Sequence, residues 1–173
     1  MQLVTVGIGE IAISENPETM LVAPNLGSCL ALSVYDRVRK RGGMVHCLLP
    51  LSHRNPGRAA KDPITFVDTG VAKLLTRMLD DGGLKSNLQI FAAGCGNIND
   101  PNDFFAIGKN NYAVLRKILW KNSLLIHAEH IGGAHPRSLK LCVRSGEVWI
   151  RVNGNESILT KGESNAIQYI DRR

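Results

Sequence analysis

The chain has 173 residues, of which 44% are hydrophobic and 21% charged, and its formal net charge is +6. The length is typical of one domain, and the apolar fraction is too high for a disordered chain. No apolar run of about 18 residues is present, which excludes a transmembrane helix, and the N-terminus lacks the basic start of a signal peptide. We therefore expect a cytoplasmic protein with a single domain over residues 1–173 and a polar tail at about 161–173.

The first half of the chain has the pattern of short strands separated by turns. Strands are predicted at residues 3–6, 11–13, 20–22, 29–35 and 44–49. In residues 29–35, Leu30, Leu32 and Val34 alternate with other residues, which is the period of a strand with one apolar face. The polar residues 51–62 are predicted to form a loop.

Positive charge is concentrated in residues 37–41, which precede the turn-like pair Gly42-Gly43. A solvated loop is the ordinary interpretation of such a segment. Contact with phosphates or with an acidic protein surface is the alternative. No aromatic RNA-binding motif, zinc finger or helix-turn-helix pattern accompanies the charge, so we predict no nucleic-acid binding.

Helical spacing of apolar residues begins at Phe66 and continues to Leu79. A buried strand at 88–92 then runs into the small-residue turn 93–96, and a second helix is marked by apolar residues from Tyr112 to Leu119. Further strands are predicted at 124–130, 138–144 and 147–152, and residues 167–173 are expected to form a short strand or a frayed tail. Strands clustered around two separate helices indicate an α+β fold.

The four cysteines are widely spaced and include no Cys-x-x-Cys pair. A secreted disulfide scaffold is shorter and denser in cysteine, so we expect reduced thiols. Most of them are expected to be small core residues. The strongest candidate for a catalytic cysteine is Cys29, in Leu26-Gly27-Ser28-Cys29, with His46 seventeen residues later.

A cysteine that attacks a carbonyl needs a nearby cation such as an imidazolium to lower its pKa, and a proton donor for the leaving group. His46 can supply both, and the N–H groups around Ser28 and Cys29 can face a developing oxyanion. The ordinary alternative is that Cys29 and His46 are packing residues. Pairing of their strands in a simple hairpin does not bring them together, because its centre would lie between Arg37 and Val38 rather than at the turn-like glycines.

His127, Glu129 and His130, with His135 nearby, are the other candidates, as metal ligands. A strand would turn residues 127 and 130 to opposite faces, and no cysteine is close in sequence. Packing or surface histidines are therefore the favoured interpretation, and we predict neither a metal nor an organic cofactor.

Motifs along nearly the whole chain resemble those of the CheD family of chemoreceptor glutamine deamidases. They are Gly7-Ile8-Gly9-Glu10, Leu26-Gly27-Ser28-Cys29, Tyr35-Asp36, Gly42-Gly43-Met44-Val45-His46 with Leu49-Pro50, Asp68-Thr69, Ile107-Gly108, Ile131-Gly132-Gly133 and Arg137. The resemblance implies packed mixed β-sheets flanked by two main helices, similar to the bacterial toxin glutamine deamidases.

The resemblance also implies a protein-glutamine glutaminase, a cysteine-dependent amidohydrolase with Cys29 as nucleophile and His46 as general base and acid. Its substrate would be glutamine side chains in the cytoplasmic region of a methyl-accepting chemoreceptor. A second implied partner is the chemotaxis phosphatase CheC, so a monomer or a heterodimer is expected. The basic segment 37–41 would flank the catalytic strands and is a candidate for docking on an acidic receptor.

Three positions depart from the family pattern. Ala23 stands where the family has a threonine of the catalytic set, residues 93–98 replace a Gly-Gly-Ala-x-Met-Phe segment, and Asn110-Asn111 replaces an Arg-Asn pair. Without the threonine hydroxyl the partner that orients His46 is unassigned; Asn25, Ser28 or a backbone carbonyl are the alternatives. A binding module that has lost catalysis, or a receptor methylesterase, remain as alternative functions.

Overall fold

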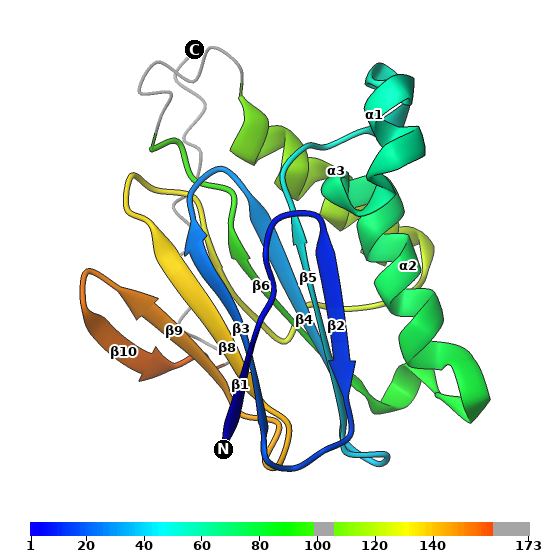
Figure 1. Cartoon of the computed structure of the whole chain (residues 1–173), viewed down its shortest axis with the longest axis vertical. Helices are drawn as coiled ribbons and strands as arrows, with labels where there is room; N and C mark the ends of the chain where they lie inside the picture. The colour runs from blue at the N-terminus through cyan, green and yellow to red at the C-terminus, as the bar shows by residue number, and fades with distance from the viewer. Residues whose placement is uncertain (99–105, 161–173) are drawn as a thin grey trace.

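The computed structural model describes residues 1–98 and 106–160, which form two five-stranded sheets and a layer of helices (Figure 1). The strands are β1 (Gln2–Thr5), β2 (Glu10–Ser14), β3 (Thr19–Leu26), β4 (Leu30–Asp36), β5 (Arg41–Cys47), β6 (Leu88–Gly94), β7 (Ala128–Ile131), β8 (Arg137–Cys142), β9 (Val148–Val152) and β10 (Asn155–Ile158). The α-helices are α1 (Pro56–Lys61), α2 (Val67–Leu79) and α3 (Ile107–Lys121). The predicted α+β class is confirmed.

Both sheets are mixed. Sheet A has the order β1-β3-β8-β9-β10, and sheet B has the order β2-β5-β4-β6-β7. The pairs β1–β3 and β6–β7 are parallel, and the other neighbours are antiparallel. No helix in the two described ranges is long and apolar enough to cross a membrane.

The helices cover one face of sheet B, and sheet A packs against the other (Figure 1). The central strand β4 is therefore buried on both faces. Leu30, Leu32 and Val34 pack with α2 and α3, whereas Ala31 and Tyr35 pack against sheet A. The predicted strand is correct, but its second face is covered by another sheet rather than by solvent.

Two further predictions need correction. The predicted loop 51–62 contains α1, which begins at Pro56 because the Asn55 side chain accepts the Arg58 N–H at 3.1 Å as an N-cap. Residues 124–127 precede β7 and are not strand, and β10 was not predicted. The predicted C-terminal strand or tail at 167–173 lies outside the described residues.

The turn between β4 and β5 is formed by residues 37–40, not by the two glycines that follow them. Asp36 closes it, because its Oδ1 accepts the N–H groups of Val38 and Arg39 at 3.0 Å each. The hairpin therefore pairs with a different register from the one that a Gly42-Gly43 turn would give.

Gly42 and Gly43 lie inside β5, and both are required by close packing. A Cβ on Gly42 would lie 2.8 Å from Cδ2 of Leu141 in sheet A. A Cβ on Gly43 would lie 2.8 Å from Sδ of Met78 and 2.9 Å from Cδ1 of Leu74, both on α2. The glycines thus let the helix layer and sheet A approach the two faces of one strand.

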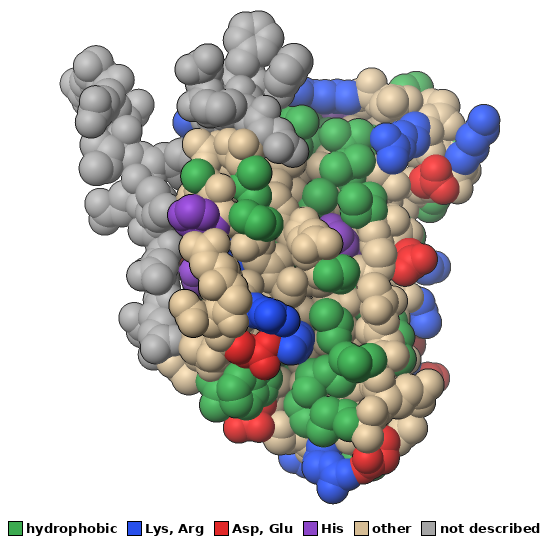
Figure 2. Space-filling model, turned by 60° about the vertical axis from the view of Figure 1, so that its left-hand side comes forward, with side chains coloured by type: hydrophobic (Ala, Val, Ile, Leu, Met, Phe, Trp, Pro, Cys, Tyr) green, Lys and Arg blue, Asp and Glu red, His purple; other side chains and the backbone are tan. Residues whose placement is uncertain are grey.

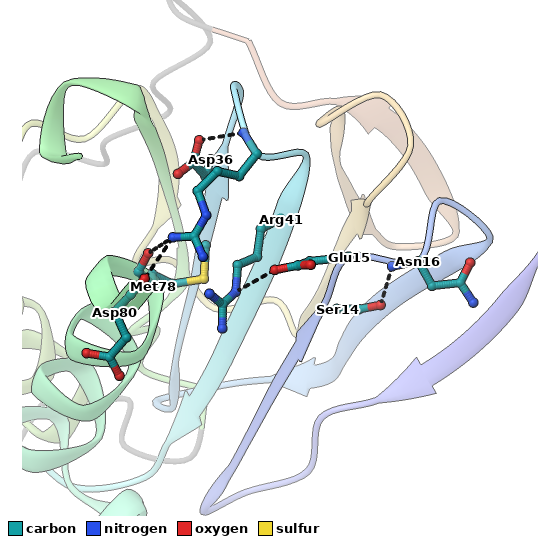
Figure 3. A network of polar contacts seen from close by, with 8 residues as sticks. Ser14, Glu15, Asn16, Asp36, Arg41, Met78 and Asp80 are labelled. Carbon is teal, nitrogen blue, oxygen red and sulfur yellow. Dashed lines mark hydrogen bonds and ion pairs between the residues drawn. The ribbon is translucent and has the colours of Figure 1, made fainter. Parts of the chain in front are cut away.

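The basic segment makes structural contacts at the turn. The Arg39 guanidinium donates to the carbonyl groups of Met78 and Asp80 at the end of α2. Arg41 forms an ion pair with Glu15 at 3.5 Å (Figure 3). The turn begins eight residues after Cys29, at the opposite end of β4, so the two are about 26 Å apart at about 3.3 Å per residue. The segment joins β4 to β5 at the end of the hairpin away from Cys29, and its docking on an acidic receptor stays a prediction.

The packing of β5 against α2 predicts a steric effect of a methyl group at position 43. We expect Gly43→Ala to lower the free energy of unfolding by about 1–3 kcal/mol, because the core is overpacked. The matched control is Gly57→Ala in α1, where a Cβ meets no atom within 4 Å. We expect the control to be neutral or to stabilise by up to about 1 kcal/mol. Urea unfolding measures both; equal stability of the two variants would contradict the packing argument.

Candidate active site

Cys29 lies directly before β4, in the short link that joins β3 of sheet A to β4 of sheet B. Its side chain is 7% exposed and packs in the core between the sheets. The turn after β6 holds the link, because the N–H of Cys95 donates to the carbonyl of Cys29 and the N–H of Gly96 donates to that of Gly27, both at 2.7 Å. The candidate nucleophile therefore sits on a fixed backbone.

The turn that follows β6 depends on Gly94. Its φ of +105° is unfavourable for residues with a side chain, and a Cβ there would overlap the carbonyl oxygen of Cys29. Gly108, at the start of α3, packs against the same turn, where a Cβ would lie 2.5 Å from the carbonyl carbon of Cys95. The predicted small-residue turn is thus the support of the Cys29 link.

His46 lies near the end of β5, on the same face of sheet B as Cys29. His46 pairs with Ala31, two residues after Cys29, and the last pair of this ladder is Leu30 with Cys47. Ala31 and Cys29 both pack in the core between the sheets, so Cys29 and His46 lie on the face of sheet B that packs against sheet A. The assumed turn at the glycines is wrong, because the turn lies before them, and the true register places His46 opposite a residue two positions from Cys29.

A backbone carbonyl orients the His46 ring. Its Nδ1 lies 3.1 Å from the carbonyl oxygen of Val6, which can only accept, so Nδ1 carries the proton of the neutral ring. Its Nε2 is buried and has no hydrogen-bond partner among the described residues. Val6 is itself fixed, because its N–H donates to the carbonyl of Val22 at 2.7 Å. A neutral imidazole with a free Nε2 lone pair is the state that a general base requires.

The motif at residues 7–10 forms the turn before β2 and places an acidic residue next to His46. Glu10 pairs with His46 across β2 and β5, and the N–H of Gly9 donates to the His46 carbonyl at 2.8 Å. The Glu10 carboxylate accepts the N–H of Gly7 at 2.7 Å. This motif therefore supports the surroundings of the histidine.

Burial favours the uncharged forms of both groups. It raises the pKa of the Cys29 thiol, and the backbone N–H of the same residue opposes this shift only in part. Burial lowers the pKa of His46, against the opposing effects of the Val6 carbonyl and the Glu10 carboxylate. Both shifts favour a thiol and a neutral imidazole over the thiolate–imidazolium pair.

Position 23, where a threonine was expected, is a fully buried alanine on β3 in the core between the sheets. Of the three alternatives for orienting His46, the structure shows a backbone carbonyl. The side chains of Asn25 and Ser28 make no hydrogen bond to the imidazole in the described part of the chain.

The sequence did not identify the residues that make two polar contacts of the site, although a backbone carbonyl was among the alternatives for His46. The carbonyl of Val6 left no signal, because every residue type carries one. Asn111 did leave a signal, since it lies four residues before the buried Leu115 and so on the apolar face of α3. Its side-chain amide donates to the carbonyl groups of Ser28 and Leu48.

The other histidines considered as ligands make structural contacts. The Nδ1 of His130 lies 2.8 Å from the Arg137 guanidinium, and the N–H of Ile90 donates to Nδ1 of His127 at 3.2 Å. Within residues 1–98 and 106–160, no three His, Cys, Asp or Glu side chains are placed to share a metal ion.

Two surface hollows lie elsewhere on the molecule. One, of about 430 Å³, is on the outer face of sheet A and includes Leu3, Met20 and Trp149. The other, of about 300 Å³, lies near Lys85 and His127. On the face seen in Figure 2, hydrophobic side chains gather in several patches between charged ones. Neither hollow is lined by Cys29 or His46, so neither identifies a site for their chemistry.

Comparison with known proteins gives one consistent family. The family model described as CheD chemotactic sensory transduction matches residues 48–152. A Solibacter usitatus protein named probable chemoreceptor glutamine deamidase CheD is 39% identical over 159 residues, which are 92% of this chain and 94% of that protein. The protein of Anaeromyxobacter dehalogenans named probable chemoreceptor glutamine deamidase CheD 2 is 40% identical over 151 residues, 87% of this chain and 95% of that protein. The family resemblance indicated by the motifs is confirmed.

The neutral resting pair predicts the pH dependence of Cys29 alkylation. Because burial raises the pKa of the thiol, the iodoacetamide rate should keep rising from about pH 6 to about pH 9, as the thiolate fraction grows. Peptide mass spectrometry separates Cys29 from Cys142, which has the same exposed fraction of 7%. A fast, pH-independent rate at Cys29 below neutral pH would reveal a thiolate–imidazolium pair and contradict the neutral pair.

Proposed function

The chain belongs to the CheD family, and from this membership and the geometry of the site we propose that it is a cysteine-dependent glutamine deamidase of chemoreceptors. The observation that carries the proposal is the orientation of His46. Its Nδ1 faces the Val6 carbonyl, and its Nε2 is unpartnered in the described part of the chain, on the sheet face that it shares with Cys29. A nucleophile and an uncharged base on adjacent strands are the minimum required for acyl transfer.

In the first half of the reaction, Sγ of Cys29 attacks the carbonyl carbon of a glutamine carboxamide as Nε2 of His46 takes the thiol proton. The imidazolium then gives this proton to the amide nitrogen. The C–N bond breaks, ammonia leaves, and a thioester remains on Cys29. The Val6 carbonyl keeps Nδ1 as the donor throughout, so the proton moves only through Nε2.

In the second half, a water molecule attacks the thioester as Nε2 of His46 takes one of its protons. The C–S bond breaks, glutamate is released, and the proton returns to Cys29. The product carries a negative charge that the glutamine lacked, which changes the electrostatics of the modified receptor. The proposed setting is the cytoplasm, the proposed substrate is the cytoplasmic region of a methyl-accepting chemoreceptor, and the phosphatase CheC is a proposed partner. The reaction as written needs no cofactor.

The deamidase proposal predicts ammonia release and glutamine-to-glutamate conversion in a purified receptor fragment. We expect Cys29→Ala to lower the rate by more than about 1,000-fold, because it removes the nucleophile. His46→Gln should lower it by about 100-fold or more, because it removes the base. The control Cys142→Ala truncates a cysteine of equal exposure and should retain activity. Mass spectrometry of receptor peptides measures the conversion.

Three outcomes would contradict the proposal. Full activity of Cys29→Ala would overturn the mechanism. A wild-type chain that binds the fragment without converting it would favour the alternative of a binding module. Release of methanol from a methylated fragment, without ammonia from the amidated one, would identify a methylesterase that uses the same nucleophile.

Orientation of His46 by a backbone carbonyl predicts a small effect of restoring threonine at position 23. We expect Ala23→Thr to change kcat by less than about tenfold, or about 1.4 kcal/mol, because Nδ1 already has its acceptor. Burying the hydroxyl should lower the free energy of unfolding by about 1–3 kcal/mol. Steady-state kinetics and urea unfolding measure the two effects. A rate gain well above tenfold would show that the Val6 carbonyl does not suffice.

A further inference from the structure

Asn111 is a fully buried polar residue in the second turn of α3. Its Nδ2 donates to the carbonyl of Ser28 at 2.9 Å and to the carbonyl of Leu48 at 3.0 Å. Ser28 immediately precedes Cys29, and Leu48 is two residues after His46. One side-chain amide therefore joins the backbone next to the candidate nucleophile to the backbone next to the candidate base.

The orientation of this amide is determined by its partners. Both are carbonyl oxygens, which can only accept, so a flipped amide would place Oδ1 against two acceptors. The two N–H bonds of Nδ2 are therefore both used, one for each strand end.

The amide acts where the strand pairing stops. The last pair of the β4–β5 ladder is Leu30 with Cys47. Beyond it the chain turns away, because the N–H groups of Leu48 and Leu49 both donate to the carbonyl of Thr65, at 2.8 and 3.0 Å. The Asn111 amide thus takes the place of the ladder for the Cys29 end of the hairpin.

The helix does not need these hydrogen bonds for its own attachment. Leu115 and Leu119 anchor α3 in the core, and the Tyr112 hydroxyl donates to Glu129 of β7 at 2.8 Å. The two bonds of Asn111 are directed instead at the segments that carry Cys29 and His46.

We propose that Asn111 is a positioning residue that sets the placement of Cys29 relative to His46. The proposal rests on the deamidase function in that it takes these two residues as a working pair. Asn111 would act on the geometry of the pair and not on the substrate. The reactivity of the Cys29 thiol therefore measures the effect of Asn111 without any receptor.

A double-mutant cycle between positions 111 and 46 tests the proposal, with the iodoacetamide rate of Cys29 at about pH 8 as the readout. We expect Asn111→Ala to lower this rate by about fivefold or more when His46 is present, and by less than about twofold in the His46→Gln background. The control Tyr112→Phe, which removes a hydrogen bond from the same helix, should leave the rate unchanged. The kcat for deamidation should fall with Asn111→Ala while KM stays within about threefold, because substrate binding is not altered.

Each other outcome overturns the proposal. Equal effects of Asn111→Ala in both backgrounds would show a merely structural role, and a thiol rate that does not depend on His46 would leave no pair to position. Asn111→Ser, which keeps one donor and leaves a smaller cavity, is the second variant in case alanine unfolds the chain. If both variants unfold while Tyr112→Phe folds, Asn111 is required for folding rather than for positioning Cys29 relative to His46. Absence of deamidation by the wild type would defeat the proposed function alone, since the thiol cycle needs no receptor.

Discussion

The candidate site depends on one peptide unit that connects the two sheets. The N–H of Val6 donates to Val22 in sheet A, and its carbonyl accepts from His46 in sheet B. Packed sheets ordinarily meet through side chains, because the backbone groups are used within each sheet. The backbone of Val6 can form hydrogen bonds with both sheets because Val6 follows the last residue of β1, where the chain leaves sheet A to enter β2 of sheet B. The orientation of the imidazole is therefore coupled to the packing of the whole sandwich.

The burial of Cys29 and His46 between the sheets explains why their uncharged forms are favoured. A charged thiolate or imidazolium is unfavourable in the core between the sheets, so burial shifts the pKa of each group toward the neutral form. The Nε2 of His46 is left without a partner in the described ranges, a buried acceptor that costs about 1–3 kcal/mol. A donor that reaches Nε2, from the Cys29 thiol during attack or from the leaving amide, removes this cost. The geometry therefore favours proton transfer during the reaction over charge separation before it.

The sequence was informative where a pattern has one physical cause. The alternation in residues 29–35 and the helical spacing after Phe66 predicted β4 and α2, and the motifs predicted the family. The glycines of β5 were misread because a glycine pair is typical both of turns and of strands that other backbone or side chains approach closely; only the positions of Leu141 and Met78 distinguish the two. That error gave the wrong hairpin register; in the true register His46 pairs with Ala31, two residues after Cys29.

The alanine at position 23, where the family resemblance led us to expect a threonine, matters only if a side chain must orient the histidine. A carbonyl does so here, and a carbonyl is independent of the residue type at position 6. The hydrogen bond between His46 and the Val6 carbonyl requires instead that the chain between β1 and β2 follow this path. Gly9 has a φ of +79°, and a Cβ there would lie 3.0 Å from Oγ1 of Thr65, while its N–H holds the carbonyl of His46. The orientation of the candidate base therefore depends on the glycine turn between β1 and β2 rather than on a side chain at position 23.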